Sequence, residues 1–156
     1  MSETKGLFDI REYVPYTLWR LSEDAGYILE ERYSEKHKIN GEGWRFMAMM
    51  ASTEPISAKK IGEFLDRDQV QVTRTLNKLL DNGYVNRRTD PKDRRKVILK
   101  LSSKGADVYQ DIVAMALELE QKILADMSSK DQDKFREILA LVGNNVDRMR
   151  AGKRLE

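Results

Sequence analysis

Cysteine is absent from the 156 residues of this chain, and histidine occurs once. Without cysteine there can be no disulfide, no thiolate metal site and no thiol that senses oxidants, and a single histidine leaves little for a nitrogen-rich metal site. No apolar run approaches the roughly 20 residues of a membrane span, and no signal-peptide-like apolar region follows Met1. We therefore expect a cytoplasmic protein that holds no metal and does not enter a membrane.

Motifs typical of enzymes are missing as well. The sequence has no glycine-rich phosphate loop and no nucleophile motif, and its carboxylates are scattered through helical charge patterns. We therefore expect no enzyme activity and no cofactor. The net charge of +2 is too small to imply nucleic-acid binding by itself, so the distribution of charge along the chain has to decide that question.

On both sides of a central segment, residues 56–105, apolar residues recur at helical spacing. Apolar residues three or four apart predict a helix from near Pro15 to about His37 and a second helix over residues 41–51, for which Asn40 is a good N-cap. His37 is expected to be exposed to solvent. Further helices are predicted from Ser102 to about Asp126 and again after Ser128. The predicted fold class is mainly α with a small β-hairpin wing, a winged helix-turn-helix plus a helical dimerisation lobe.

Residues 56–83 predict two short helices joined by a tight turn. Ser57 is a good cap for the first helix. Three apolar residues of that helix are expected to face inward: Ile61, Phe64 and Leu65. Asp68 with Gln71 three places later predicts a capping box that opens the second helix, and Gly83 predicts its end. This order is typical of a helix-turn-helix.

The period then changes to that of strands. Residues 85–89 and 97–101 predict a two-stranded hairpin, joined by a charged tip that contains the turn pair Asp90-Pro91. The basic residues here are Arg87, Arg88, Lys92, Arg94, Arg95, Lys96, Lys100 and Lys104, against Asp90 and Asp93 alone. Such a cluster predicts a positive surface for phosphates, and an arginine at a hairpin tip suits a narrow minor groove.

The second helix of the pair offers polar side chains on its expected outer face. They are Gln69, Gln71, Thr73, Arg74, Asn77 and Lys78. Gln and Arg can form bidentate hydrogen bonds with base edges, whereas Thr and Lys suit phosphates and thymine methyl groups. Each feature alone is equally compatible with a solvated surface. Their order along the chain favours the binding of double-stranded DNA.

Three segments carry a resemblance to a known family: LNKLLDNGYV (76–85), RTDPKDRR (88–95) and VILKLSSKG (97–105). Together they resemble the winged-helix signature of the MarR family of multiple-antibiotic-resistance-type regulators, with Ser102 where Thr is usual. The resemblance implies that the helix over 69–82 enters the major groove and that Arg95 at the wing tip enters the minor groove. By the same resemblance Asp93 orients Arg95 and Arg94 contacts a phosphate, although Asp93 is also compatible with a plain turn residue.

The order of the outer helices resembles the family too, which implies one MarR-type domain over residues 1–156 that forms a homodimer. The winged helix-turn-helix would span about 41–105, and the dimerisation helices about 7–38 and 105–152. Two-fold symmetry would set the two major-groove helices about one DNA turn, roughly 34 Å, apart on a pseudo-palindromic operator. The alternative is that the outer helices pack on one another within one chain.

Family members commonly release DNA when a small aromatic or phenolic compound binds between the dimer lobe and the winged lobe. The resemblance therefore implies a ligand-responsive repressor, and Tyr16, Trp19 and Arg20 are candidates for binding an acidic aromatic effector. Aromatic residues at such positions are more often part of a core or a dimer interface. A transcriptional activator and a winged-helix module that binds an acidic protein partner remain the alternative functions.

Overall fold

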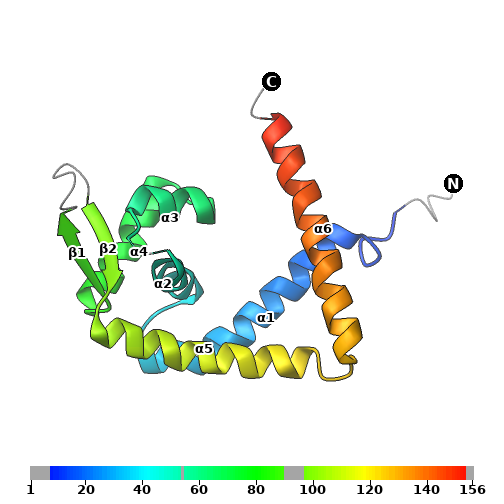
Figure 1. Ribbon diagram of the computed structural model, residues 1–156, viewed down its shortest axis with the longest axis horizontal. Coiled ribbons are helices and arrows are strands. Elements are labelled where there is room, and N and C mark those ends of the chain that lie inside the picture. The colour runs from blue at the N-terminus through cyan, green and yellow to red at the C-terminus, as the bar shows by residue number, and fades with distance from the viewer. Residues whose placement is uncertain (1–7, 54, 90–96, 154–156) are drawn as a thin grey trace, which may run out of the picture. The chain divides into compact units, whose positions relative to one another are not determined.

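The computed structural model describes residues 8–53, 55–89 and 97–153. Its elements are α1 (Val14–His37), α2 (Gly41–Ser52), α3 (Ala58–Leu65), α4 (Gln69–Asp81), β1 (Val85–Thr89), β2 (Val97–Leu101), α5 (Ser103–Ile123) and α6 (Ser129–Lys153) (Figure 1). The predicted fold class, mainly α with a two-stranded hairpin, is confirmed. The chain forms two compact units, residues 1–117 and 118–156.

The predicted helix caps are present. The Asn40 side chain accepts a hydrogen bond from the Gly43 backbone N–H at 3.0 Å, and the Ser57 side chain accepts one from Lys60 at 3.3 Å. Asp68 accepts one from the Gln71 backbone N–H at 2.8 Å. Each bond satisfies a donor that the first helical turn leaves without a partner. The starts of α2, α3 and α4 are therefore determined by residues next to them in sequence.

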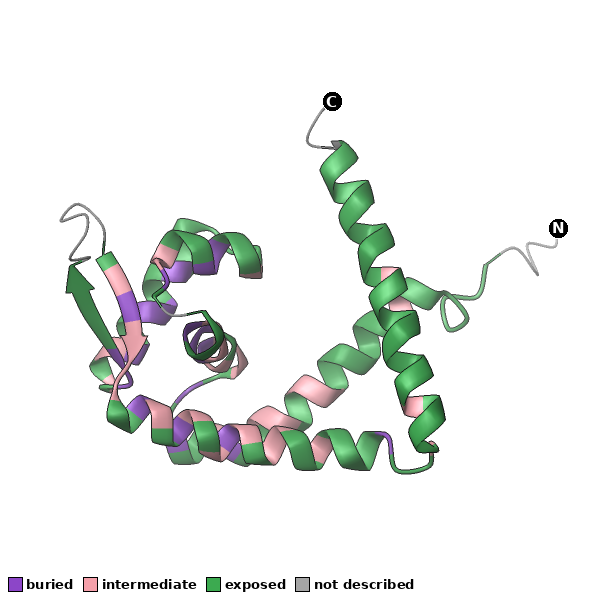
Figure 2. Cartoon of the chain, in the orientation of Figure 1, coloured by how far each residue is buried: buried purple, intermediate pink, exposed green. Residues whose placement is uncertain are grey.

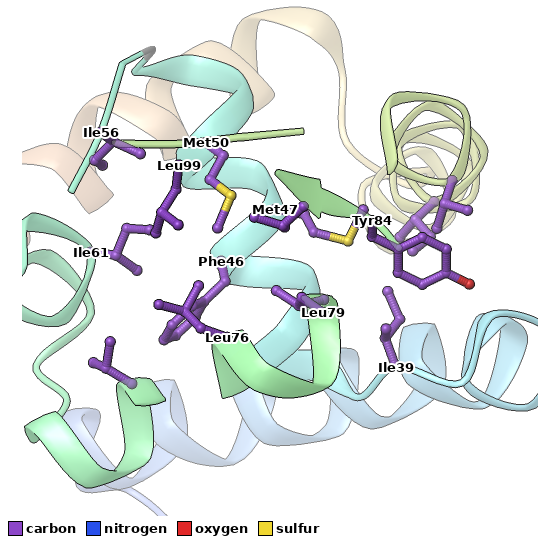
Figure 3. Packing of buried hydrophobic residues seen from close by; sticks show 14 of the residues in the cluster. Ile39, Phe46, Met47, Met50, Ile56, Ile61, Leu76, Leu79, Tyr84 and Leu99 are labelled. Carbon is purple, nitrogen blue, oxygen red and sulfur yellow. The ribbon is translucent and has the colours of Figure 1, made fainter. Parts of the chain in front are cut away.

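The core of the first unit is built around α2. The Phe46, Met47 and Met50 side chains have no exposed surface. Figure 3 shows them facing side chains from the other elements, among them Leu76 and Leu79 of α4. Because the helix is apolar nearly all round, it can be surrounded by the helix-turn-helix and the wing without burying charge.

The wing is held on both edges of β2. β1 and β2 pair antiparallel, from Val85 opposite Leu101 to Thr89 opposite Val97. On the other edge of β2, the Leu99 N–H donates to the Ile56 carbonyl oxygen at 2.9 Å. The Leu99 side chain is buried in the core. The base of the hairpin is therefore joined to the segment that leads into the helix-turn-helix.

A close junction connects α4, the wing and α5. Gly83 ends α4 with a φ of +72°, which glycine adopts without strain. The Ser102 N–H donates to the Tyr84 carbonyl oxygen at 2.9 Å, and the Tyr84 hydroxyl donates to the His37 carbonyl oxygen at 2.8 Å. A Cβ on Gly105 would lie 1.9 Å from that same Tyr84 oxygen. The junction therefore requires a residue without a side chain at the start of α5.

The prediction that Phe64 faces inward is wrong, since 71% of its surface is exposed. The buried face of α3 is made by Ile61 and Gly62. A Cβ on Gly62 would lie 2.9 Å from a Val72 methyl carbon, so α4 approaches α3 on the glycine side. This close approach turns the contact face toward Gly62 and leaves Phe64 outside it.

The prediction that His37 is exposed is also wrong, because only 8% of its surface is accessible. Its Nε2 lies 2.7 Å from Oδ2 of Asp111 on α5, and the same oxygen accepts a hydrogen bond from Lys36 Nζ at 2.6 Å. The hydrogen bonds from Lys36 and His37 hold the pKa of the Asp111 carboxyl below its ordinary value. The C-terminal end of α1 is thus attached to α5 by charged groups.

The second unit consists of the end of α5 and all of α6. Arg136 donates to Glu120 at 3.1 Å, and the Gln132 side chain donates to the Leu124 carbonyl oxygen at 3.3 Å. No described residue of α6 is buried, and the helix is coloured as exposed over nearly its whole length in Figure 2. Its large exposed apolar residues are Phe135, Ile138, Leu139, Leu141, Val146 and Met149.

Candidate nucleic-acid interface

Helix α4 has two sharply different faces. Its buried residues are Val72, Thr75, Leu76 and Leu79. All six polar residues predicted to contact DNA are exposed: Gln69, Gln71, Thr73, Arg74, Asn77 and Lys78. The fold therefore brings this set to the surface of one helix whose other side is fixed in the core.

Two of these six side chains already make hydrogen bonds within the helix. The Gln71 side-chain oxygen accepts from the Asp68 backbone N–H at 3.3 Å and completes the capping box. The Thr73 hydroxyl donates to the Gln69 carbonyl oxygen at 2.8 Å. Gln71 therefore has its amide N–H groups left to offer a ligand, whereas Thr73 would have to break its bond to Gln69 in order to donate to one.

A carboxylate of α2 contacts the buried face of α4. Glu42 Oε2 accepts a hydrogen bond from the Thr75 hydroxyl at 2.8 Å, and its Oε1 accepts one from Arg67 Nε at 3.0 Å. Arg67 lies in the turn between α3 and α4, so Glu42 connects α2 to the turn and to the second helix of the helix-turn-helix. Sequence reasoning missed this contact, because nothing local links residues 33 positions apart.

The positive surface predicted for the wing lies only in part within the described residues. Arg87 and Arg88 are exposed on β1. Lys104, which the sequence grouped with them, instead donates to the Asn82 carbonyl oxygen at 2.9 Å and lies 5.0 Å from the centre of the Tyr84 ring. Its charge therefore stabilises the C-terminal end of α4. The wing-tip residues Asp93, Arg94 and Arg95 lie outside the described residues.

The candidate effector residues lie together on one turn of α1. The Tyr16 and Trp19 ring centres are 5.6 Å apart at an interplanar angle of 39°. Trp19 is 58% exposed. Arg20 is exposed and pairs with Asp24 at 3.2 Å, so its charge is already partly balanced.

Neither a metal-binding cluster nor a membrane span occurs among residues 8–53, 55–89 and 97–153. Within those residues, no group of three or more His, Cys, Asp or Glu side chains could hold a metal ion. Within the same residues, no helix is both long enough and apolar enough to cross a membrane.

The family model of the MarR family matches residues 39–97, which run from the start of α2 to the first residue of β2. This segment belongs to the MarR family. The resemblance seen in the sequence is confirmed by this match. The MarR-family segment contains α4 and its supporting residue Glu42.

Two curated relatives of this chain are named as regulators. An uncharacterised HTH-type transcriptional regulator of Bacillus subtilis, YwoH, is 30% identical over 83 residues, which cover 53% of this chain and 60% of that protein. The HTH-type transcriptional regulator BilQ of Clostridium symbiosum is 26% identical over 80 residues, 51% of this chain and 56% of that protein. The chain thus spans little more than half the length of these relatives.

Solved structures share the fold over much more of the chain. A MarR/EmrR family transcriptional regulator from Acinetobacter matches with a TM-score of 0.79 and 23% identity, covering 90% of this chain and 99% of that one. The PcaV transcriptional regulator from Streptomyces coelicolor, solved in complex with its natural ligand, matches with a TM-score of 0.70 and 18% identity, covering 89% and 97%. These matches show that the fold, helices on both sides of the winged segment included, occurs in MarR-family proteins.

Proposed function

We propose that the protein is a sequence-specific DNA-binding transcriptional regulator, and that it acts as a ligand-responsive repressor on a pseudo-palindromic operator. One observation carries the proposal. The exposed face of α4 presents base-reading side chains, while its buried face is packed against α2 and its middle is held by Glu42. A rigid helix with polar groups on its free side is suited to the major groove.

The relatives support the same function, because both curated relatives described above are named as HTH-type transcriptional regulators. A regulator must share a compartment with the chromosome, in agreement with the cytoplasmic location expected from the sequence. Repression rather than activation is part of the proposal. A reporter driven by the operator should be more active after deletion of the gene; lower activity would identify an activator.

Selection of bound fragments from a random DNA pool tests sequence specificity. The expected result is an inverted repeat whose half-sites are one helical turn apart, bound at least ~10³-fold more tightly than unrelated DNA. Arg95→Ala should cost about 1–3 kcal/mol of specific binding if this residue enters the minor groove. An Arg95→Ala protein with wild-type operator affinity would remove the wing from the proposal. Equal, weak binding to every duplex would favour a module for an acidic protein partner.

A homodimer is also part of the proposal. The residues Phe135, Ile138, Leu139, Val142, Val146 and Met149 recur three or four places apart on α6, so they share one face, and most are exposed. Contiguous apolar surface of this kind usually marks an interface. One α4 helix alone would read only a short half-site, so dimerisation also supplies the second set of base contacts.

The dimer can be tested with two matched substitutions on α6. Ile138→Glu adds a charge to the apolar face, whereas Asn144→Glu adds the same charge near the opposite face of the helix. We expect Ile138→Glu, but not Asn144→Glu, to give a monomer in gel filtration and to abolish operator binding. Truncation before Ser128 should have the same effect. A monomeric truncated chain with full operator affinity would refute the dimer.

A small aromatic or phenolic acid is the proposed effector, with Tyr16, Trp19 and Arg20 as its contacts. Adjacent rings beside a cation suit an aromatic carboxylate. Binding can release DNA only if the ligand prefers a form of the dimer that does not fit the operator. A screen of aromatic acids for operator release should find active compounds, and Trp19→Ala should raise the concentration needed. If Trp19→Ala leaves that concentration unchanged, the effector binds elsewhere.

A further inference from the structure

Val70 is an apolar residue in the middle of the exposed, polar face of α4. It lies in the first turn of the helix, two places after the Asp68 cap, and 78% of its surface is exposed. Thr73, Arg74 and Asn77 follow it at the three-, four- and seven-residue spacing that keeps side chains on one helix face. Val70 therefore lies among the predicted DNA contacts rather than beside them.

The side of α4 opposite Val70 is packed in the core. The buried residues Leu76 and Leu79 point toward α2 in Figure 3, and Thr75 is held by Glu42. A helix turns by about 100° per residue, which puts Val70 nearly opposite the centre of this buried face. The surface around Val70 thus points away from the core, where α4 would meet a duplex.

Nothing within the described fold accounts for an isopropyl group at this position. A β-branched residue is a weaker helix former than most polar residues, and at this exposure it buries little apolar area. Single apolar residues on a surface are common and need no function. The position of Val70 distinguishes it, because the N-terminal residues of a major-groove helix are the ones that contact base edges.

The major groove contains one apolar group, the C5-methyl of thymine. The neighbouring Thr73 hydroxyl donates to the Gln69 carbonyl oxygen, so it would have to break that bond to donate to a base. Val70 and Thr73 together therefore form a small region on α4 that is poor in donors, next to the donors of Arg74 and Asn77. Apolar contact is the form of base recognition that such a region can provide.

We propose that Val70 is a specificity-determining residue that contacts the C5-methyl group of a thymine in each operator half-site. The inference rests on the proposed function, since it needs α4 in the major groove, and it names one base that the operator must contain. The thymine should lie beside the base pairs read by Arg74 and Asn77.

The test uses the full-length protein and the operator selected from the random pool. Each thymine of a half-site is replaced in turn by deoxyuridine, which lacks the methyl group and keeps every hydrogen-bonding atom. For the wild-type protein, one such position per half-site should weaken binding about fourfold, the value expected for burying one methyl group. At that position Val70→Ala should prefer the thymine operator to the deoxyuridine operator by a smaller factor than the wild type does, because alanine offers less apolar surface to the methyl group.

The paired comparison separates recognition from folding. Val70→Ala places a better helix former at an exposed site, so its thermal midpoint should not fall. The inference is overturned if no thymine methyl affects wild-type binding, or if Val70→Ala still prefers thymine to deoxyuridine by the wild-type factor. In both cases operator binding remains and the proposed function stands. If the pool yields no preferred sequence, the proposed function fails together with the inference.

Discussion

Replacing Gly105 by alanine should damage the junction between α4, the wing and α5. The added Cβ would lie 1.9 Å from the Tyr84 carbonyl oxygen and 2.8 Å from its carbonyl carbon. Both are backbone atoms, so no side chain can rotate away to make room. Either α5 or the start of β1 must move by about 1 Å to restore an ordinary contact distance.

The cost can be estimated from the contacts at this junction. Overpacking typically costs about 1–3 kcal/mol. Movement also strains the hydrogen bond from Ser102 N to Tyr84 O, now 2.9 Å long, and an unsatisfied buried acceptor costs about 1–3 kcal/mol. Alanine recovers about 1 kcal/mol of helix propensity. The free energy of unfolding should therefore fall by about 1–5 kcal/mol, against the total of about 5–15 kcal/mol that is typical of a domain.

Gly143→Ala is the matched control. Gly143 also lies within a helix, but a Cβ there would meet no atom within 4 Å. It should raise the stability by about 0.5–1 kcal/mol, because alanine loses less backbone entropy. Urea unfolding followed by circular dichroism, at one protein concentration for all variants, gives both values. The reasoning is refuted if Gly105→Ala is as stable as the wild type or gains stability as Gly143→Ala does.

Three further predictions concern single contacts. Thr75→Val should destabilise the fold by about 1–2 kcal/mol in urea unfolding, because Glu42 loses a hydrogen bond at a partly buried site. The control Thr73→Val, at an exposed position, should change the stability by less than ~0.5 kcal/mol. Equal effects of the two substitutions would contradict a role for Glu42. The lowered pKa of Asp111 means that its stabilising effect is present above the ordinary value of 3.8 and is lost as the pH falls through its lower folded-state pKa. Urea midpoints below about pH 4 should therefore fall more steeply for the wild type than for Asp111→Asn, and parallel curves would contradict this. Lys78→Ala should weaken binding to all DNA sequences alike and reduce the slope of log affinity against log salt by about one, whereas an unchanged slope would mean that Lys78 contacts no phosphate.

The sequence alone determined the elements that depend on neighbouring residues. The caps at Asn40, Ser57 and Asp68 and the strands over 85–89 and 97–101 follow from short-range hydrogen bonding and from periodicity, and the structure has them where they were predicted. The polar face of α4 was predictable for the same reason, because a helix converts spacing in the sequence into position around its axis.

Tertiary structure alone decided which helix faces meet and which charges find a partner. Phe64 is exposed because Gly62, which has no side chain, lets Val72 approach α3 closely on that side. The periodicity of α3 does not reveal this contact. His37 is buried because Asp111, 74 positions away, supplies an acceptor for its ring. Such pairings depend on distances between elements far apart in the sequence. The support of α4 by Glu42, 33 positions away from Thr75, likewise became visible only in the folded chain.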